Sequence, residues 1–562
     1  MNKPLSEYPR PQLYRDSYLS LNGYWEYNFS YEPEIPVRWE GLILVPYSPE
    51  TKASGVHRLL HPKEYLFYRL KFKLDDLVIK DKVLLHFLGV DQIADVYLND
   101  HHLGQHIGGF LPFEFDIKPY LQEENILVVR VQDLTDTSYY SRGKQKLEHG
   151  GIWYTSQSGI YFPVFIESVS NDYIKNVKFT PDIDNEEIII NVETEAKEVG
   201  LHIFGMDRPI DPNKDVHIKV KAMHLWSPED PYLYFVKIYT DNDEVASYFA
   251  MRKFSMIKDE QGHLRLALNN KPYFMKGVLD QGYYKDGLLT PNSYDDYIKD
   301  IDLVESLGFN TIRKHIKIEI PRWYFECDKR GIIVWQDFVN GGESYKFSTI
   351  AFPLITGVHH NDHNYKKFNR ENKEGREQAI KEFKETINYL YNVPSIGLWT
   401  IFNEGWGQFD SKEVYEEMSK LDPTRLFDHA SGWHDQGVSD VKSLHVYFKK
   451  VKMPNKKKIN QRAVILSEFG GFLLPIKDHM MKGKKTYKVY NDYTKWVKQY
   501  QDCIYRDVIS NIPKGLSACI YTQLSDVEEE LNGFITFDRE VIKVNVDDIK
   551  GINDKITYKV TK

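Results

Sequence analysis

The stretch IGLWTIFNEGWGQFD, residues 396–410, carries an uncharged run that ends at a carboxylate. The run from Ile396 to Phe402 holds no charged residue, which is typical of a strand buried on both faces of a parallel sheet. Asn403 and Glu404 follow at once. In parallel barrels the functional side chains lie at the carboxyl ends of the strands. The stretch therefore predicts a buried strand whose end presents Glu404 for chemistry.

A second stretch, RAVILSEFGGF at residues 462–472, has the same construction and ends its apolar run at Glu468. Two carboxylates at the strand ends of one barrel are what retaining glycoside hydrolysis needs, because one attacks the anomeric carbon and the other protonates the leaving oxygen. For a single glutamate the alternative is a residue that caps the next helix. Two glutamates in matched contexts favour the catalytic interpretation.

The chain beyond residue 258 alternates between strand and helix patterns, which is typical of a (β/α)8 barrel. A helix is expected over SYDDYIKDIDLVESLG, with Ser293 as its N-cap and Gly308 as its stop. The polar stretch 340–375 is expected to be an insertion after the third strand. The eight expected strands lie in PYFMKGVLD, FNTIRKHI, IIVWQDF, residues 396–402, RLFDHAS, SLHVYF, AVILSEF and LSACIYTQL.

The chain before residue 258 shows short alternating runs separated by turn residues, as in β-sandwiches. Asn99 and Asp100 are expected to form a hairpin turn between ADVYL and HHLG. We therefore predict a multidomain fold: a jelly-roll β-sandwich with a sugar-binding-like character (1–170), an immunoglobulin-like β-sandwich (171–257), and a catalytic (β/α)8 TIM barrel (258–562).

Composition and charge exclude several classes of protein. The 73 basic and 81 acidic residues give a net charge of −8, which does not favour nucleic acid as a partner. The amino terminus lacks the apolar core of a signal peptide, and no window is apolar enough for a membrane span. Three cysteines, odd in number, argue against a disulfide framework. We therefore expect a cytoplasmic protein with no membrane association, and the sequence leaves a homo-oligomer open.

Eight motifs together resemble glycoside hydrolase family 2, the family of β-galactosidases, β-glucuronidases and β-mannosidases, along essentially the whole chain. They occur in family order and are YPRPQLYRDSYLSLNGYWEY, GGIWYTSQSGIYFPVFIE, LWSPEDPYLY, FAMRKF, FNTIRKH, WTIFNEGWG, LSEFGG and YTQLSDVEEELNG.

The resemblance implies roles for individual residues. Glu404 matches the family's acid/base, and Glu468 matches its nucleophile. Asn403 would hydrogen-bond the sugar 2-hydroxyl, and Arg313 would orient the nucleophile, with a purely structural ion pair as the alternative. Tyr447 could donate to the nucleophile.

Further residues are expected at the sugar. His445 points to the same end of the barrel, although it could equally be a core histidine. Tyr521 stands where relatives often carry a tryptophan beneath the sugar. The other candidate contacts are Trp335 and Trp406, for which core packing is the alternative, together with Asp280, Asn532 and Trp153 of the jelly-roll loop.

The choice of sugar depends on departures from the family pattern. The glucuronidase branch carries Asn-x-Lys near its end, and here Asn532 is present but Phe534 occupies the lysine position. The histidine-rich segment that follows strand one in the galactosidase branch is not matched either, because here it reads GVLDQGYYKDG. Neither specificity is directly supported by these motifs. The leading expectation is a retaining exo-β-glycosidase that is β-galactosidase-like and has a β-glycoside as its carbohydrate substrate.

Two alternatives stay open. Lysine runs in FKKVKMPNKKK and IKDHMMKGKKTYK would favour an acidic sugar such as a glucuronide or galacturonide, unless they are only solvated loops. A non-catalytic carbohydrate-binding protein is the alternative from a different class. No cofactor and no metal are expected, because the histidines of GVHHNDHN lack the ligand spacing of a known site.

Overall fold

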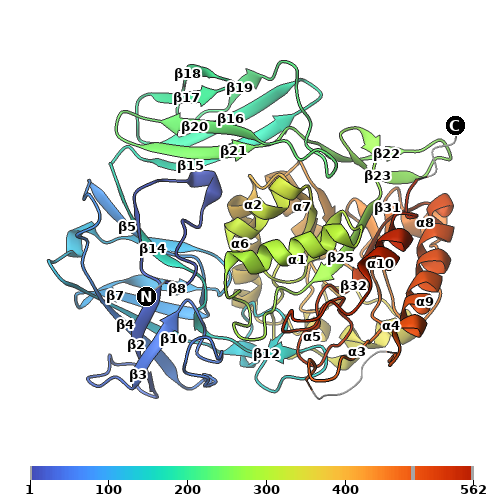
Figure 1. Ribbon diagram of the computed structural model, residues 1–562, viewed down its shortest axis with the longest axis horizontal. Coiled ribbons are helices and arrows are strands. Elements are labelled where there is room, and N and C mark those ends of the chain that lie inside the picture. Colours follow the sequence, from blue (N-terminus) through green and yellow to red (C-terminus); the bar gives the residue numbers. More distant parts are fainter. Residues whose placement is uncertain (1–2, 482–487, 559–562) are drawn as a thin grey trace.

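The structure is a computed structural model, and it describes residues 3–481 and 488–558. Two β-sandwiches lie beside an α/β barrel (Figure 1). The first sandwich, in blue, and the barrel lie side by side, and the second sandwich, in green, lies across both. The predicted fold class, two sandwiches and a TIM barrel, is confirmed.

The first sandwich consists of two antiparallel sheets with the strand orders β3-β2-β4-β10-β7-β8 and β1-β14-β5-β9. Asn99 and Asp100 form the predicted turn between β7 and β8, and both have positive φ angles, 48° and 67°. Two short pairs, β6 with β13 and β11 with β12, complete the region. The strands are β1 (Tyr18–Ser20), β2 (Gly23–Ser30), β3 (Gly41–Val45), β4 (Tyr65–Phe72), β5 (Lys82–Phe87), β6 (Val90–Asp91), β7 (Ile93–Leu98), β8 (His101–Ile107), β9 (Phe113–Asp116), β10 (Asn125–Gln132), β11 (Gln145–Lys146), β12 (Tyr154–Thr155), β13 (Gly159–Ile160) and β14 (Val164–Val169).

The second sandwich packs a sheet of order β15-β16-β19 on a sheet of order β18-β17-β20-β21. Alternating residues such as Ile188, Ile190 and Val192 of β16 are fully buried between the sheets, as the period of two predicts. The strands are β15 (Ile174–Asp182), β16 (Glu187–Thr194), β17 (Val199–Ile203), β18 (Met206–Ile210), β19 (Val216–Lys219), β20 (Tyr234–Tyr239) and β21 (Glu244–Phe249).

The barrel is a parallel sheet of eight strands in the order β29-β28-β27-β26-β25-β32-β31-β30. Its two end strands are in contact, and Ser443 of β30 donates a hydrogen bond to Asp428 of β29, so the barrel is nearly closed. The strands are β25 (Met275–Asp280), β26 (Thr311–Lys314), β27 (Ile333–Asp337), β28 (Ile396–Thr400), β29 (Leu426–Asp428), β30 (Val441–Val446), β31 (Ala463–Gly470) and β32 (Leu516–Thr522). All eight expected strands are present.

Helices surround the barrel strands (Figure 1). Helix α1 begins with the predicted Ser293, whose side chain forms a capping box with Asp296, and helix α2 ends at Gly331, which adopts a left-handed conformation. The helices are α1 (Tyr294–Ser306), α2 (Pro321–Arg330), α3 (Phe347–Ile350), α4 (Phe352–Thr356), α5 (Tyr365–Phe368), α6 (Lys373–Leu390), α7 (Ser411–Leu421), α8 (Lys456–Ile459), α9 (Tyr493–Cys503) and α10 (Val546–Asn553), with the short helices η1 (Pro11–Leu13), η2 (Lys118–Tyr120), η3 (Thr135–Thr137), η4 (Ile504–Val508) and η5 (Ile509–Lys514). The predicted insertion after the third strand contains α3, α4 and α5.

A small sheet, β22-β23-β24, covers the amino-terminal end of the barrel. Phe254 and Leu266 from this sheet pack with Leu279 and Ile465 of the barrel interior. Strand β22 spans the predicted limit at residue 257, and the domain limits at 170 and 257 remain predictions. The strands are β22 (Phe254–Lys258), β23 (Leu264–Leu268) and β24 (Lys271–Pro272).

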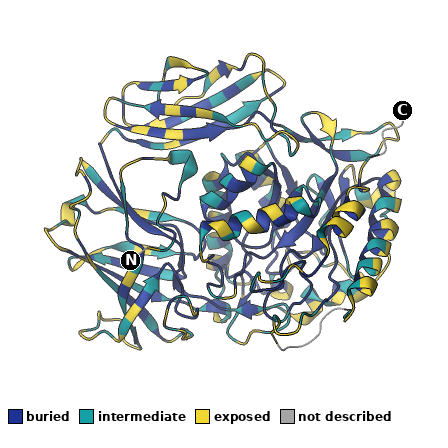
Figure 2. Cartoon of the chain, in the orientation of Figure 1, coloured by how far each residue is buried: buried dark blue, intermediate teal, exposed yellow. Residues whose placement is uncertain are grey.

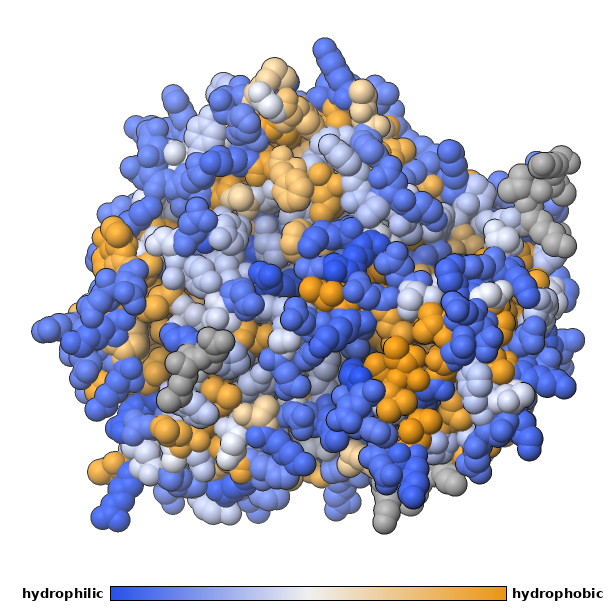
Figure 3. All heavy atoms as spheres, in the orientation of Figure 1, coloured by the Kyte–Doolittle hydropathy of each residue, from blue (hydrophilic) through white to orange (hydrophobic). Residues whose placement is uncertain are grey.

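Burial follows this layering. The barrel strands are dark blue in Figure 2, whereas the helices around them carry exposed residues on their outer faces. Polar and charged residues cover most of the face in Figure 3, with a hydrophobic patch on the barrel half. None of the helices within residues 3–481 and 488–558 combines the length and the apolar character that a bilayer crossing needs.

Candidate active site

The two strand-end glutamates meet at the carboxyl ends of the barrel strands. Glu404 follows β28, Glu468 lies within β31, and His445 of β30 lies between them. One carboxylate oxygen of each glutamate and one nitrogen of His445 all lie within 4.8 Å of one another. Carboxyl groups about 5–5.5 Å apart belong to retaining glycosidases, whereas inverting enzymes separate them further to admit a water. The geometry therefore fits the retaining arrangement.

Glu468 is surrounded by positive and hydrogen-donating groups. Arg313 Nη1 donates to Glu468 Oε1 at 3.0 Å, and the Tyr447 hydroxyl donates to Oε2. Burial alone would raise the pKa of Glu468, but the charges of His445 and Arg313, with the Tyr447 hydrogen bond, lower it to about 2. Glu468 is therefore ionised at neutral pH, as a nucleophile must be.

Glu404 lies in a different environment. His445 Nδ1 lies 2.8 Å from Glu404 Oε1, and 12% of the Glu404 side chain is exposed. Burial raises the pKa of Glu404, and the negative charge of Glu468 raises it further, while His445 acts in the opposite direction. The two carboxyl groups are therefore shifted in opposite directions, as an acid and a nucleophile require.

Arg313 connects Glu468 to Asn403. Its Nη2 donates to Asn403 Oδ1 at 2.8 Å, which turns the amide nitrogen of Asn403 away from the arginine. That nitrogen, Nδ2, is buried and has no protein partner in the described part of the chain. A buried donor without a partner costs free energy unless a ligand accepts from it. Asn403 is thus ready to bind a hydroxyl group.

Three residues of the site were missed in the sequence. Asp337 ends β27 and accepts two hydrogen bonds of 2.9 Å from Arg313, while His315 lies 2.8 Å from the same carboxylate. Ser431 Oγ lies 3.0 Å from His445 Nε2. The rule that singled out Glu404 and Glu468, a carboxylate at the end of an apolar strand, also applies to Asp337.

Aromatic side chains from two parts of the chain meet beside the catalytic pair. The Trp153 ring lies 5.0 Å from Trp406 and 5.6 Å from Tyr345. Trp406 comes two residues after Glu404, whereas Trp153 belongs to the jelly-roll region. Figure 1 shows β12, which follows Trp153, lying against the barrel. The structure therefore brings Trp153 of the jelly-roll region beside Trp406 of the barrel.

Three other predicted sugar contacts have partners in the core of the protein. Trp335 is fully buried inside the barrel, where its indole nitrogen lies 3.3 Å from the Met275 sulfur. Tyr521 packs on the helix side of β32 against Tyr500 of α9. Asp280 forms a buried ion pair of 2.5 Å with Lys314. For these residues the structure supports a role in the core.

Asn532 is part of a buried chain of amides. Gln523 Nε2 donates to Asn532 Oδ1 at 2.7 Å, and Gln281 Nε2 donates to Gln523 Oε1 at 3.0 Å. The outer atoms of this chain, Gln281 Oε1 and Asn532 Nδ2, have no protein partner among the described residues. They are neutral groups that a hydroxyl can satisfy. Phe534, at the position where a lysine was looked for, is buried in the core.

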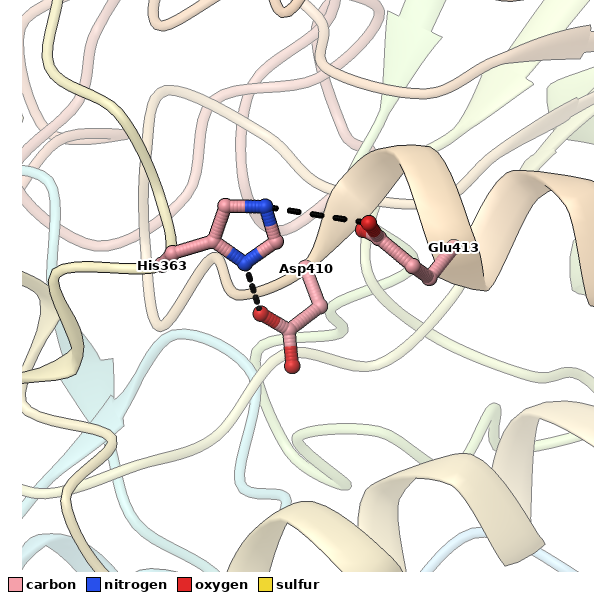
Figure 4. A group of neighbouring side chains, drawn as sticks. All are labelled: His363, Asp410 and Glu413. Atoms are coloured by element: carbon pink, nitrogen blue, oxygen red, sulfur yellow. Dashed lines mark hydrogen bonds and ion pairs between the residues drawn. The ribbon is translucent and has the colours of Figure 1, made fainter.

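The three histidines of GVHHNDHN do not converge on one point, because each has different neighbours. His359 Nδ1 accepts a hydrogen bond from the His434 amide, and His360 stacks on the His434 ring. His363 lies between Asp410 and Glu413, and Figure 4 shows that its two ring nitrogens point to different carboxylates. His363 contacts both carboxylates, and one ligand atom from each of the three residues lies within 4.8 Å of the others, so the group also has the spacing of a metal-binding cluster.

Comparisons with known proteins agree with this fold. Residues 257–544 match the TIM barrel domain of glycosyl hydrolases family 2, and residues 53–159 match the glycosyl hydrolase 2 galactose-binding domain-like family. A β-galactosidase of Thermoanaerobacter pseudethanolicus is 25% identical over 77% of this chain and 58% of its own length. A β-galactosidase of Halalkalibacterium halodurans is 23% identical over 75% of this chain and 45% of its own length. The chain thus spans about half the length of these curated relatives.

Solved structures share the whole fold. The β-galacturonidase of Eisenbergiella tayi bound to galacturonate has a TM-score of 0.73 and 17% identity, and covers 98% of this chain and 100% of its own. A β-D-glucuronidase of Dictyoglomus thermophilum has a TM-score of 0.74 and 19% identity. That match covers 98% of this chain and 99% of the glucuronidase. Because the family's barrel domain matches more than half of the sequence, this chain belongs to glycoside hydrolase family 2.

Proposed function

We propose that the protein is a retaining exo-β-glycosidase that removes a terminal β-linked sugar through a covalent glycosyl-enzyme intermediate. The observation that carries the proposal is the pair Glu404 and Glu468, whose oxygens approach within 4.8 Å while their pKa values are shifted in opposite directions. Such a pair supplies a protonated acid and an ionised nucleophile at the same pH.

In the first step Glu468 attacks the anomeric carbon, and the bond to the leaving oxygen breaks as Glu404 gives that oxygen its proton. In the second step a water attacks the anomeric carbon, Glu404 takes its proton, and the Glu468 ester bond breaks. Arg313 and Tyr447 stabilise Glu468 when it is released as an anion. Asn403 Nδ2 would donate to the sugar 2-hydroxyl, a contact that strengthens in the transition state.

For the sugar we propose a neutral, β-galactoside-like ring. In the part of the chain that the structure describes, the buried lysines near this end of the barrel each face a carboxylate. Lys314 contacts Asp280 and Glu319, Lys317 contacts Glu319, and Lys144 lies 3.6 Å from Glu530. The unsatisfied groups of the amide chain are neutral, so they suit hydroxyls better than a carboxylate.

A panel of nitrophenyl β-glycosides tests the choice of sugar, with galactoside, glucuronide, galacturonide, mannoside, glucoside and fucoside as its members. We expect the galactoside or another neutral member to be turned over fastest. Preference for a uronide would instead support the acidic-sugar alternative that the lysine runs raise. The second of these runs includes residues 482–487, which lie outside the described residues.

The mechanism is tested by trapping. A 2-deoxy-2-fluoro β-glycoside with a good leaving group should leave a sugar adduct on the peptide that contains Glu468, detected by mass spectrometry. The Glu468→Gln variant should show neither the adduct nor turnover. A wild-type protein that binds sugars but hydrolyses no member of the panel would instead be a carbohydrate-binding protein on this scaffold.

A further inference from the structure

We propose that three consecutive glutamates, Glu528, Glu529 and Glu530, form a clamp that positions Trp153 as one wall of the substrate site. The clamp lies in the loop that follows β32, whereas Trp153 belongs to the jelly-roll region. The three glutamates would be positioning residues, because they act through Trp153 and do not touch the reacting atoms. This inference rests on the proposed glycosidase function.

Each glutamate of the clamp accepts a hydrogen bond from a different residue of the 149–155 segment. The Thr155 amide donates to both oxygens of Glu528, at 3.0 and 3.2 Å. The Gly151 amide donates to Glu529 Oε2 at 2.9 Å, and the Tyr154 hydroxyl donates to Glu530 Oε2.

Ion pairs strengthen the same contact. His149 lies 3.3 Å from Glu528, and Lys144 lies 3.6 Å from Glu530. Glu528 and Glu530 are only 3% and 2% exposed, so their charges need these partners. Two segments more than 370 positions apart in sequence are thus joined by polar contacts at every clamp residue.

Both sides of the contact are tight turns. Val527 and Glu530 exchange two backbone hydrogen bonds, which leaves Glu528 and Glu529 at the tip of one turn. Gly150 and Trp153 do the same, which leaves Gly151 at the tip of the other. Gly151 has a φ of 63°, which glycine adopts without strain. The position of Trp153 is therefore set by its own turn, and the tip of that turn is held by Glu529.

The clamped tryptophan lies where it can contact substrate. Its ring is 5.0 Å from Trp406, which follows Glu404 by two residues. Aromatic faces bind the apolar faces of pyranose rings. If the clamp is loosened, Trp153 no longer holds a fixed position and substrate binding weakens. The catalytic pair is anchored by other residues, so the chemical step should be largely unaffected.

The test compares Glu529→Ala with Glu529→Gln, because glutamine keeps an oxygen that can accept from Gly151. We expect Glu529→Ala to raise KM about tenfold, equivalent to about 1.4 kcal/mol, with kcat little changed. Glu529→Gln should stay close to wild type. The matched control is Glu187→Ala, which removes a carboxylate that is ion-paired with Lys219 in the second sandwich.

A second readout does not depend on activity. Hydrogen exchange measured by mass spectrometry should show faster exchange of the peptide containing Gly151 and Thr155 in Glu529→Ala, and unchanged exchange in Glu187→Ala. Unchanged exchange in Glu529→Ala would refute the clamp. Faster exchange with an unchanged KM would refute the positioning role.

A double-mutant cycle tests whether Glu529 affects substrate binding through Trp153. Combined with Trp153→Ala, the Glu529→Ala change should add little further loss, because both act through one ring. Fully additive effects on KM would contradict the inference. If the wild-type protein hydrolysed no glycoside, the proposed function would fail, while the exchange measurement would still decide whether the clamp exists.

Discussion

Replacing Arg313 by lysine should reduce kcat/KM by about 10²- to 10⁴-fold. The guanidinium is fully buried and donates to Asp337 twice, and once each to Glu468 and Asn403. A lysine ammonium has three donors at one point, so it cannot reach all three side chains. At least two charge-assisted hydrogen bonds are lost, each worth about 1.5–3 kcal/mol. The sum of about 3–6 kcal/mol corresponds to the stated range of rates.

The assay is kcat/KM on a nitrophenyl glycoside as a function of pH. Lysine keeps the positive charge that helps to lower the pKa of Glu468, so the acidic limb of the profile should stay near its wild-type position while the rate falls. The control is Arg265→Lys. Arg265 is a buried arginine at the other end of the barrel that donates to Asp259 and to two backbone carbonyls. If Arg313→Lys kept activity within about threefold of the Arg265→Lys control, the role assigned to Arg313 would be refuted.

Glu404→Gln should slow hydrolysis of a disaccharide by about 10²- to 10⁴-fold. Hydrolysis of a dinitrophenyl glycoside should be spared, because its leaving group needs no proton. Equal losses on both substrates would contradict the acid assignment. Tyr447→Phe removes a donor to Glu468, so its pKa should rise, the acidic limb of kcat/KM should move to higher pH, and kcat/KM should fall about tenfold. Burial raises the pKa of Glu50 to about 8, so stability should fall as pH rises from about 4.5 to about 8. The urea midpoint of Glu50→Gln should depend less on pH across that window, and an unchanged dependence would show that Glu50 is not the group responsible.

The barrel and the meeting of Glu404 with Glu468 could be predicted because their signals are local. Parallel strands covered on both faces appear as uninterrupted apolar runs, and every residue of β31 is buried. A charge at the end of such a run stands out, which is why Glu404 and Glu468 were found. Turn and cap residues such as Asn99 and Ser293 carry local signals of the same kind.

The positions of Tyr521 and Trp335 could not be predicted from these runs. All residues of β32 are buried, so burial does not reveal whether Tyr521 faces the interior or the helices, and a shift of one residue reverses the answer. Trp335 faces the barrel interior and is paired in register with Arg313. It lies two residues before the end of β27, at a depth where side chains fill the barrel. The contact between the 149–155 segment and Glu529 depends on how two distant loops dock, for which a single sequence carries no periodic signal.

The different roles of the two glutamates follow from their neighbours. Glu404 follows a buried strand and Glu468 lies within one, and burial by itself raises the pKa of each carboxyl group. His445 contacts both, so it cannot be the source of the difference. Arg313 and Tyr447 hydrogen-bond to Glu468, whereas Glu404 is hydrogen-bonded to His445. The proposed nucleophile is for this reason the carboxylate beside the arginine, Glu468, and its negative charge in turn raises the pKa of Glu404. Removing Arg313 should for this reason weaken both the proposed nucleophile, Glu468, and the proposed acid, Glu404.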